Sequence, residues 1–130
     1  MKITKHLSER SFLFLAILWT VIITVLSLVS LYSIPQVDVP GKDKIVHFLF
    51  YSVFVIFWSF SKNKWCSNWN YSLLIVCLAI VYGIIIEVLQ SVLTHTREAD
   101  LNDILANSLG AIVGFVCVYC VKNKFFNKFF

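Results

Sequence analysis

Four long runs of apolar residues, separated by short stretches of charged residues, proline and glycine, dominate the pattern of hydrophobic and polar positions along the chain. The runs cover about residues 12–32, 45–60, 69–93 and 101–121. Each is as long, or nearly as long, as the roughly 20 apolar residues that a helix needs to cross a bilayer. The pattern therefore predicts four membrane-spanning helices.

The composition points the same way. Of the 130 residues, 59% are hydrophobic and only 14% are charged, and the mean hydropathy is +0.83. The segments between the runs are too short for a soluble domain, and they contain no low-complexity linker or repeat. We therefore expect an all-α fold, an integral membrane four-helix transmembrane bundle that residues 1–130 form as a single domain.

Basic residues flank the apolar runs at three places. They are Lys2, Lys5 and Arg10, then Lys62 and Lys64, then Lys122, Lys124 and Lys128. Because basic loops stay in the cytoplasm, both termini and the middle loop are predicted there, with the other two loops outside. The first run is too long for a signal peptide and no cleavage site follows it, so we expect a retained anchor. The net charge of +4 then reflects topology, and no nucleic-acid partner is expected.

Polar and small residues recur every three or four positions in the last three runs. This spacing places the residues of one helix on a single face. The second run carries Asp43, His47 and Tyr51; the third carries Gly83, Glu87 and Gln90; the fourth carries Asp100, Asp103, Asn107, Gly110 and Gly114. Ionisable residues inside membrane helices usually mark a functional site, because burying a charge in lipid is costly.

The three faces are expected to meet at one end of the bundle. The second helix starts outside, the third ends there and the fourth starts there. Glu87 in the bilayer must bind a proton or pair with His47, Arg97 or a cation. We therefore predict a shared outward-facing polar pocket. Its candidate ligand-binding residues are Asp43, Lys44, His47, Tyr51, Glu87, Gln90, Arg97, Asp100, Asp103 and Asn107.

Local roles offer a competing account for some of these residues. Asp43 is suited to capping the second helix, and Asp100 to capping the fourth, where Asp103 supports the same first turn. This account leaves His47, Glu87 and Asn107 unexplained. The shared pocket accounts for the whole set with one cause.

Glycine and cysteine positions give two further expectations. Gly110 and Gly114 are spaced to permit close helix contact, and we expect their face to pack against the third helix. No disulfides are expected, because Cys66 lies in the cytoplasmic middle loop and Cys77, Cys117 and Cys120 lie in apolar surroundings near the cytoplasmic ends of their helices. We expect Cys117 and Cys120 to pack in the core rather than to share a metal ion.

Three motifs carry a resemblance to a known family. They are Asp43-Lys44-x-x-His47-Phe48-x-x-Tyr51, Glu87-x-x-Gln90, and Arg97-x-x-Asp100-x-x-Asp103-x-x-x-Asn107-x-x-Gly110-x-x-x-Gly114. Together they resemble the VanZ-like family of small bacterial membrane proteins, whose first-described member is associated with low-level teicoplanin resistance. The resemblance implies a four-helix multi-pass protein of the bacterial cytoplasmic (inner) membrane and a role at the cell envelope, including glycopeptide antibiotic susceptibility. It supplies no reaction.

Two classes of function remain open, and binding ranks first. The pocket would hold the headgroup of a membrane lipid, a cell-wall precursor or a lipid-linked phosphate. Arg97 and Lys44 would then pair with anionic groups, while carboxylates and amides hold hydroxyls or amines. No cofactor is required for this function.

The second class is a membrane-embedded enzyme, a hydrolase or phosphoryl-group enzyme acting on a lipid-linked substrate. Its catalytic candidates are His47, Glu87 and Asp103: one acid would act as general base beside His47, or the acids and His47 would hold a divalent cation. It ranks lower because the sequence contains no nucleophile elbow or glycine-rich phosphate loop. A transporter ranks third, since one four-helix bundle is small for a transport pathway.

Overall fold

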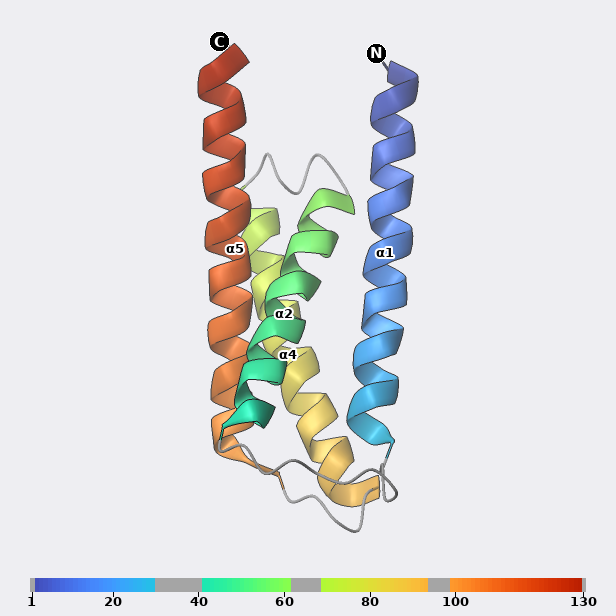
Figure 1. Ribbon diagram of the computed structural model, residues 1–130, viewed down its shortest axis with the longest axis vertical. Helices are drawn as coiled ribbons and strands as arrows, with labels where there is room; N and C mark the ends of the chain where they lie inside the picture. Colours follow the sequence, from blue (N-terminus) through green and yellow to red (C-terminus); the bar gives the residue numbers. More distant parts are fainter. Residues whose placement is uncertain (1, 30–40, 62–68, 94–98, 130) are drawn as a thin grey trace.

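Four α-helices make up the bundle in the computed structural model of the protein (Figure 1). The structure describes residues 2–29, 41–61, 69–93 and 99–129. The helices are α1 (Lys2–Leu28), α2 (Lys42–Ser61), α4 (Trp69–Leu93) and α5 (Leu101–Phe129). No strand occurs within these ranges. The predicted all-α, four-helix membrane architecture is confirmed.

Each helix coincides with a predicted apolar run, but most of the helix ends differ from the ends of the runs. Helix α4 matches the predicted 69–93, but α1 begins at Lys2 and ends at Leu28, in place of 12–32. Helix α2 is longer than the predicted 45–60 at both ends, and α5 continues to Phe129, beyond residue 121. An apolar run marks what the bilayer can hold, whereas a helix continues into water as long as its backbone bonds are made.

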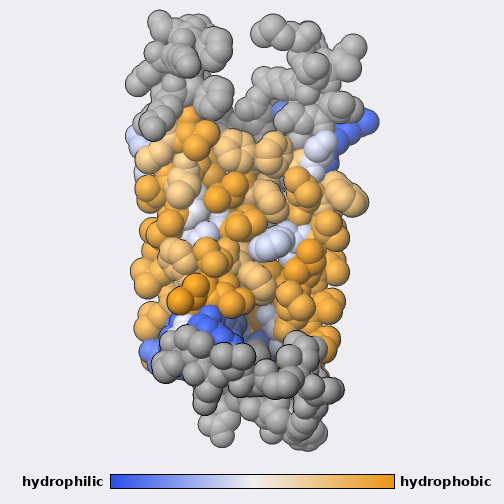
Figure 2. Space-filling view, viewed as in Figure 1, coloured by the Kyte–Doolittle hydropathy of each residue, from blue (hydrophilic) through white to orange (hydrophobic). Residues whose placement is uncertain are grey.

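All four helices are long and apolar enough to cross a membrane. The candidate spans are Glu9–Leu28, Lys42–Ser61, Trp69–Leu93 and Leu101–Lys122. Figure 2 shows apolar residues over most of the visible surface, with hydrophilic residues mainly towards its two ends. Exposed leucine, isoleucine and valine side chains would be unfavourable in water, but they are the surface that lipid solvates.

The direction of the helices decides which residues meet. Helix α1 begins and α5 ends at one end of the bundle, while α2 begins, α4 ends and α5 begins at the other (Figure 1). The polar ends of α2, α4 and α5 are therefore neighbours, as the sequence predicts.

Helices α2 and α5 approach each other most tightly at two glycines. A Cβ atom on Gly110 would clash with the backbone of Phe48, and one on Gly114 would lie 2.5 Å from the Ser52 carbonyl oxygen. The Ser52 hydroxyl donates to the Gly110 carbonyl at 2.9 Å and to the Phe48 carbonyl at 2.8 Å. The expectation that this glycine face packs against residues 69–93 is wrong, since its partner is α2. Small residues allow another helix to approach closely, but they do not determine which helix that is.

Helix α1 is held to α2 and α4 by hydrogen bonds between side chains and backbone. The Trp19 indole nitrogen donates to the Phe50 carbonyl at 3.0 Å, and the hydroxyls of Thr24 and Tyr82 lie 2.8 Å apart. The Tyr82 hydroxyl also donates to the Thr20 carbonyl at 3.1 Å. In lipid such bonds supply part of the attraction that apolar contact supplies in water.

The described cysteines correct a second expectation. Cys77, Cys117 and Cys120 are free, as expected, but Cys117 and Cys120 are exposed on the outer surface of the bundle and do not pack in its core. Both environments are apolar in a membrane protein, so the character of the neighbouring residues does not separate a core position from a lipid-facing one.

Candidate functional site

The first turns of α2 form one side of the polar end of the bundle. Gly41 precedes α2 with a φ of +81°, a conformation that favours glycine, and its carbonyl accepts the first helical hydrogen bond, from the Ile45 amide at 3.2 Å. Asp43 and Lys44 follow in the first turn with half-exposed side chains. His47 lies one turn deeper and is buried. The helix therefore carries polar side chains from the membrane surface into the bundle.

Asp100 caps α5 on the opposite side, as the sequence predicts. Its carboxylate accepts from the Asn102 amide at 2.8 Å, and its backbone carbonyl accepts from the Asp103 amide at 3.0 Å. The Asn102 amide and the Lys44 ammonium both stabilise the ionised form, so the pKa of the Asp100 carboxyl lies below its ordinary value. The cap thus places a carboxylate at the rim of the site.

Lys44 links the two sides. Its ammonium nitrogen lies 3.2 Å from Asp100 Oδ2 and 3.6 Å from Asp103 Oδ1. Because the Lys44 and Asp100 side chains are 44% and 41% exposed, this pair contributes little to stability. Its main effect is to occupy the ammonium group. We call Asp43, Lys44 and Asp100 the rim of the site.

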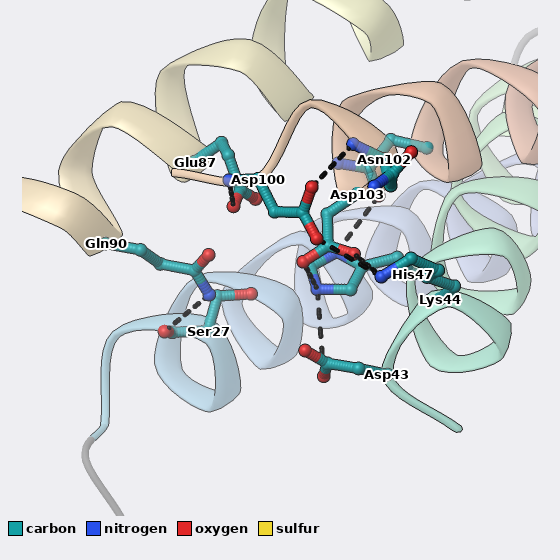
Figure 3. Close-up of polar contacts among 10 residues, drawn as sticks. Ser27, Asp43, Lys44, His47, Glu87, Gln90, Asp100, Asn102 and Asp103 are labelled. Atoms are coloured by element: carbon teal, nitrogen blue, oxygen red, sulfur yellow. Dashed lines mark hydrogen bonds and ion pairs between the residues drawn. The ribbon is translucent and has the colours of Figure 1, made fainter. Parts of the chain in front are cut away.

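His47 is the centre of the buried part (Figure 3). Its Nδ1 lies 3.1 Å from Asn107 Oδ1. Its Nε2 faces two carboxylates, with Asp103 Oδ2 at 3.8 Å and Asp43 Oδ1 at 4.0 Å. Both distances are too long for a direct hydrogen bond.

Glu87 reaches across from α4 to the start of α5. Its Oε1 accepts from the Asp100 backbone amide at 3.1 Å, so the partner is a backbone group and not the histidine, arginine or cation expected from the sequence. The residue is almost completely buried, and no hydrogen bond reaches its Oε2 from the described part of the chain. A buried carboxylate oxygen without a donor is unfavourable.

Tyr51 and Asn107 also carry buried polar atoms without a partner in the described part of the chain, as does Asp103 at Oδ1. Tyr51 and Asn107 are 1% and 2% exposed, and within the described residues no partner reaches the tyrosine hydroxyl or the asparagine Nδ2. Gly83 makes room for both, because a Cβ there would lie 3.1 Å from Asn107 Nδ2 and 3.2 Å from Tyr51 Cε1. Polar groups from α2, α4 and α5 therefore lie close together with unused hydrogen-bonding capacity.

The structure brings most of the predicted site residues together at this end. We call them the polar cluster: Asp43, Lys44, His47, Tyr51, Glu87, Asp100, Asp103 and Asn107. Gln90 instead turns to α1, where its Nε2 donates to the Ser27 carbonyl at 2.9 Å (Figure 3). Arg97 lies outside the described residues.

Two contributors were not predicted. The carbonyl of Ser27 and the backbone amide of Asp100 are main-chain groups, which leave no sequence signal. Ser52, which contacts Gly110 and Gly114, was not predicted either, but the sequence holds a signal for it. It is a small residue next to Tyr51, and two glycines at a spacing of four favour a small residue on the facing helix.

The polar cluster carries more negative than positive groups. It contains four carboxyl groups but only one ammonium, that of Lys44, and one imidazole. Ligand atoms of Asp43, His47 and Asp103 lie within 4.8 Å of one another, close enough to share one metal ion. The arrangement can thus accept hydrogen bonds from hydroxyls or amines, or bind a cation.

Comparison with known proteins gives the family. Neither the curated proteins nor the solved structures yielded a match. The sequence profile of the VanZ/LLP1 family matches residues 11–122, which include all four candidate membrane spans except Glu9 and Arg10 at the start of the first. The match covers most of the chain and every residue of the polar cluster. The chain therefore belongs to the VanZ/LLP1 family.

Proposed function

We propose that the protein binds the polar headgroup of a cell-envelope lipid or of a cell-wall precursor at the polar cluster. The lysine-rich segments support a cytoplasmic location for both termini, in a bacterial cytoplasmic membrane. The cluster lies at the opposite end of the bundle from the termini, so it would face outward, where such headgroups are exposed. A bound precursor would link the protein to glycopeptide antibiotic susceptibility.

One observation carries this proposal. Glu87 Oε2, Asn107 Nδ2 and the Tyr51 hydroxyl are all buried in the polar cluster without hydrogen bonds from the described residues. Leaving three such groups unpaired costs about 1–3 kcal/mol each. A ligand that supplies donors and acceptors there would recover much of this cost, and the recovered energy would favour binding.

The charges favour a particular kind of headgroup. Lys44 is already paired with Asp100 and Asp103, so an anionic group would compete with two carboxylates for one ammonium. Hydroxyl and amine groups instead find free acceptors on Glu87 and a free donor on Asn107. The preferred ligand is therefore a headgroup rich in hydroxyls or amines, such as a sugar or an aminoalkyl group.

Native mass spectrometry of the full chain, purified in mild detergent, tests the proposal. We expect the wild-type protein to retain a lipid of this class, and Glu87→Gln to retain at least tenfold less at equal helix content. Ser91→Ala is the control, because its exposed hydroxyl lies one turn after Glu87 and, within the described residues, donates to the Val88 carbonyl. Equal lipid retention in all three proteins contradicts the proposal.

An enzymatic function is the second candidate, and His47 favours it. Its Nε2 lies between the Asp43 and Asp103 carboxylates, an arrangement in which the imidazole could take up a proton from a nucleophile. Glu87 and Asp103 are the remaining catalytic candidates. Turnover of a lipid-linked phosphate by the purified protein, abolished in His47→Gln, would replace binding by catalysis as the function.

A further inference from the structure

We infer that Asp43, His47 and Asp103 form a binding site for one divalent transition-metal ion of the Zn²⁺ class. Their ligand atoms all lie within 4.8 Å of one another. Zinc bonds to nitrogen and carboxylate oxygen are about 2.0–2.2 Å long, which places two ligands of a tetrahedral ion about 3.4 Å apart. The observed separations of 3.8 and 4.0 Å from His47 Nε2 need only small side-chain movements to reach this value.

The hydrogen bond between His47 and Asn107 selects the imidazole tautomer that can bind a metal ion through Nε2. Nδ1 lies 3.1 Å from the Asn107 carbonyl oxygen, an acceptor, so Nδ1 carries the proton. In the neutral ring Nε2 then has a free lone pair, and this lone pair faces two carboxylates. Three electron-rich atoms converge on one point, which a cation stabilises. A histidine ligand held by an acceptor on its other nitrogen is the usual arrangement at metal sites.

Asp103 gives an independent reason. Its side chain is 9% exposed, and its Oδ1 receives no hydrogen bond from the described residues. The Lys44 ammonium lies on the Oδ1 side at 3.6 Å, whereas Oδ2 faces His47. The carboxylate thus separates the ammonium from the metal position and leaves Oδ2 available. Positive charge stabilises a carboxylate buried to this degree, and the Lys44 ammonium at 3.6 Å supplies it on the Oδ1 side only.

The donor set determines the class of metal. One imidazole and two carboxylates suit Zn²⁺ and similar ions, whereas Mg²⁺ and Ca²⁺ prefer oxygen ligands throughout. Three protein ligands leave a fourth position for water or a ligand oxygen. Asp43 is 55% exposed, so the ion can enter from the membrane surface.

Metal titration of the full chain tests this inference. The protein is purified in detergent with a tag that contains no histidine, treated with chelator, and titrated with Co²⁺ and then Zn²⁺. We expect one Co²⁺ per chain, displaced by Zn²⁺, with at least tenfold weaker binding in Asp43→Asn and in His47→Gln. Asp43→Asn is the main variant because its exposed side chain can change without disturbing the fold. Glu9→Gln removes the same charge near the start of α1, at the opposite end of the bundle, and is the matched control.

Three results overturn the inference. They are no binding by the wild-type chain, equal weakening by Glu9→Gln and Asp43→Asn, or a sulfur-to-cobalt charge-transfer band, which would assign the ion to cysteines. Lipid retention is measured on the same samples. If the wild-type protein retains lipid but binds no metal ion, the metal inference is wrong and the headgroup proposal still stands. The two proposals are therefore tested separately.

Discussion

Substituting Gly110 by alanine should weaken the contact between α2 and α5. The new Cβ would lie 2.9 Å from the Phe48 carbonyl carbon and 3.0 Å from its Cα, so the helices must separate by about 1 Å to reach ordinary contact. Such overpacking costs about 1–3 kcal/mol. Loss of the Ser52–Gly110 hydrogen bond adds about 0.6 kcal/mol, and the better helix propensity of alanine returns about 1 kcal/mol. The expected net loss is roughly 0.5–2.5 kcal/mol of unfolding free energy.

The assay is reversible unfolding by a denaturing detergent in mixed micelles, followed by tryptophan fluorescence. Leu109→Ala is the control, because this neighbouring side chain is exposed to lipid and its truncation should change the unfolding free energy by less than about 0.5 kcal/mol. A Gly110→Ala protein as stable as the control would refute the close α2–α5 approach.

Three other perturbations test the site and the topology. The effects of Glu87→Gln and Asp103→Asn on the unfolding free energy should be non-additive by at least about 0.5 kcal/mol, because both residues bond to the backbone of Asp100. Additive effects would show that the two residues are not coupled. The lowered pKa of Asp100 contributes stability above about pH 4 that is lost as pH falls through that lowered pKa, so Asp100→Asn should flatten the acid end of the pH–melting-temperature curve; an unchanged curve contradicts this. A membrane-impermeant thiol reagent should label Arg97→Cys from outside and miss Cys66, and the reverse pattern would invert the topology.

The number and position of the helices were predictable because lipid imposes strong demands on composition. A spanning segment must be apolar and must satisfy its own backbone, so the run at 69–93 coincides with α4. Helix ends were less predictable, since polar residues such as those before Glu9 continue α1 beyond the membrane span. Lipid-facing and core residues are equally apolar, which is why Cys117 was expected in the core and lies on the surface.

Helical spacing predicted which polar residues gather, but not how they pair. His47 and Asn107 lie on the expected faces and meet. Glu87 bonds to a backbone amide, and Gln90 bonds to a backbone carbonyl on α1. Every residue has such main-chain groups, so only the three-dimensional fold decides which of them a buried side chain reaches.

The account depends on a headgroup entering the buried part of the polar cluster. The most direct measurement is NMR of ¹⁵N-asparagine-labelled protein in nanodiscs made from envelope lipids, where contacts between headgroup protons and the side-chain amides are recorded. Asn102 is exposed beside Asp100 of the rim, and Asn107 is 2% exposed, so the two side-chain amides report on the surface and on the interior. The account predicts headgroup contacts at the Asn107 amide that disappear in Glu87→Gln. Headgroup contacts confined to Asn102 would contradict it.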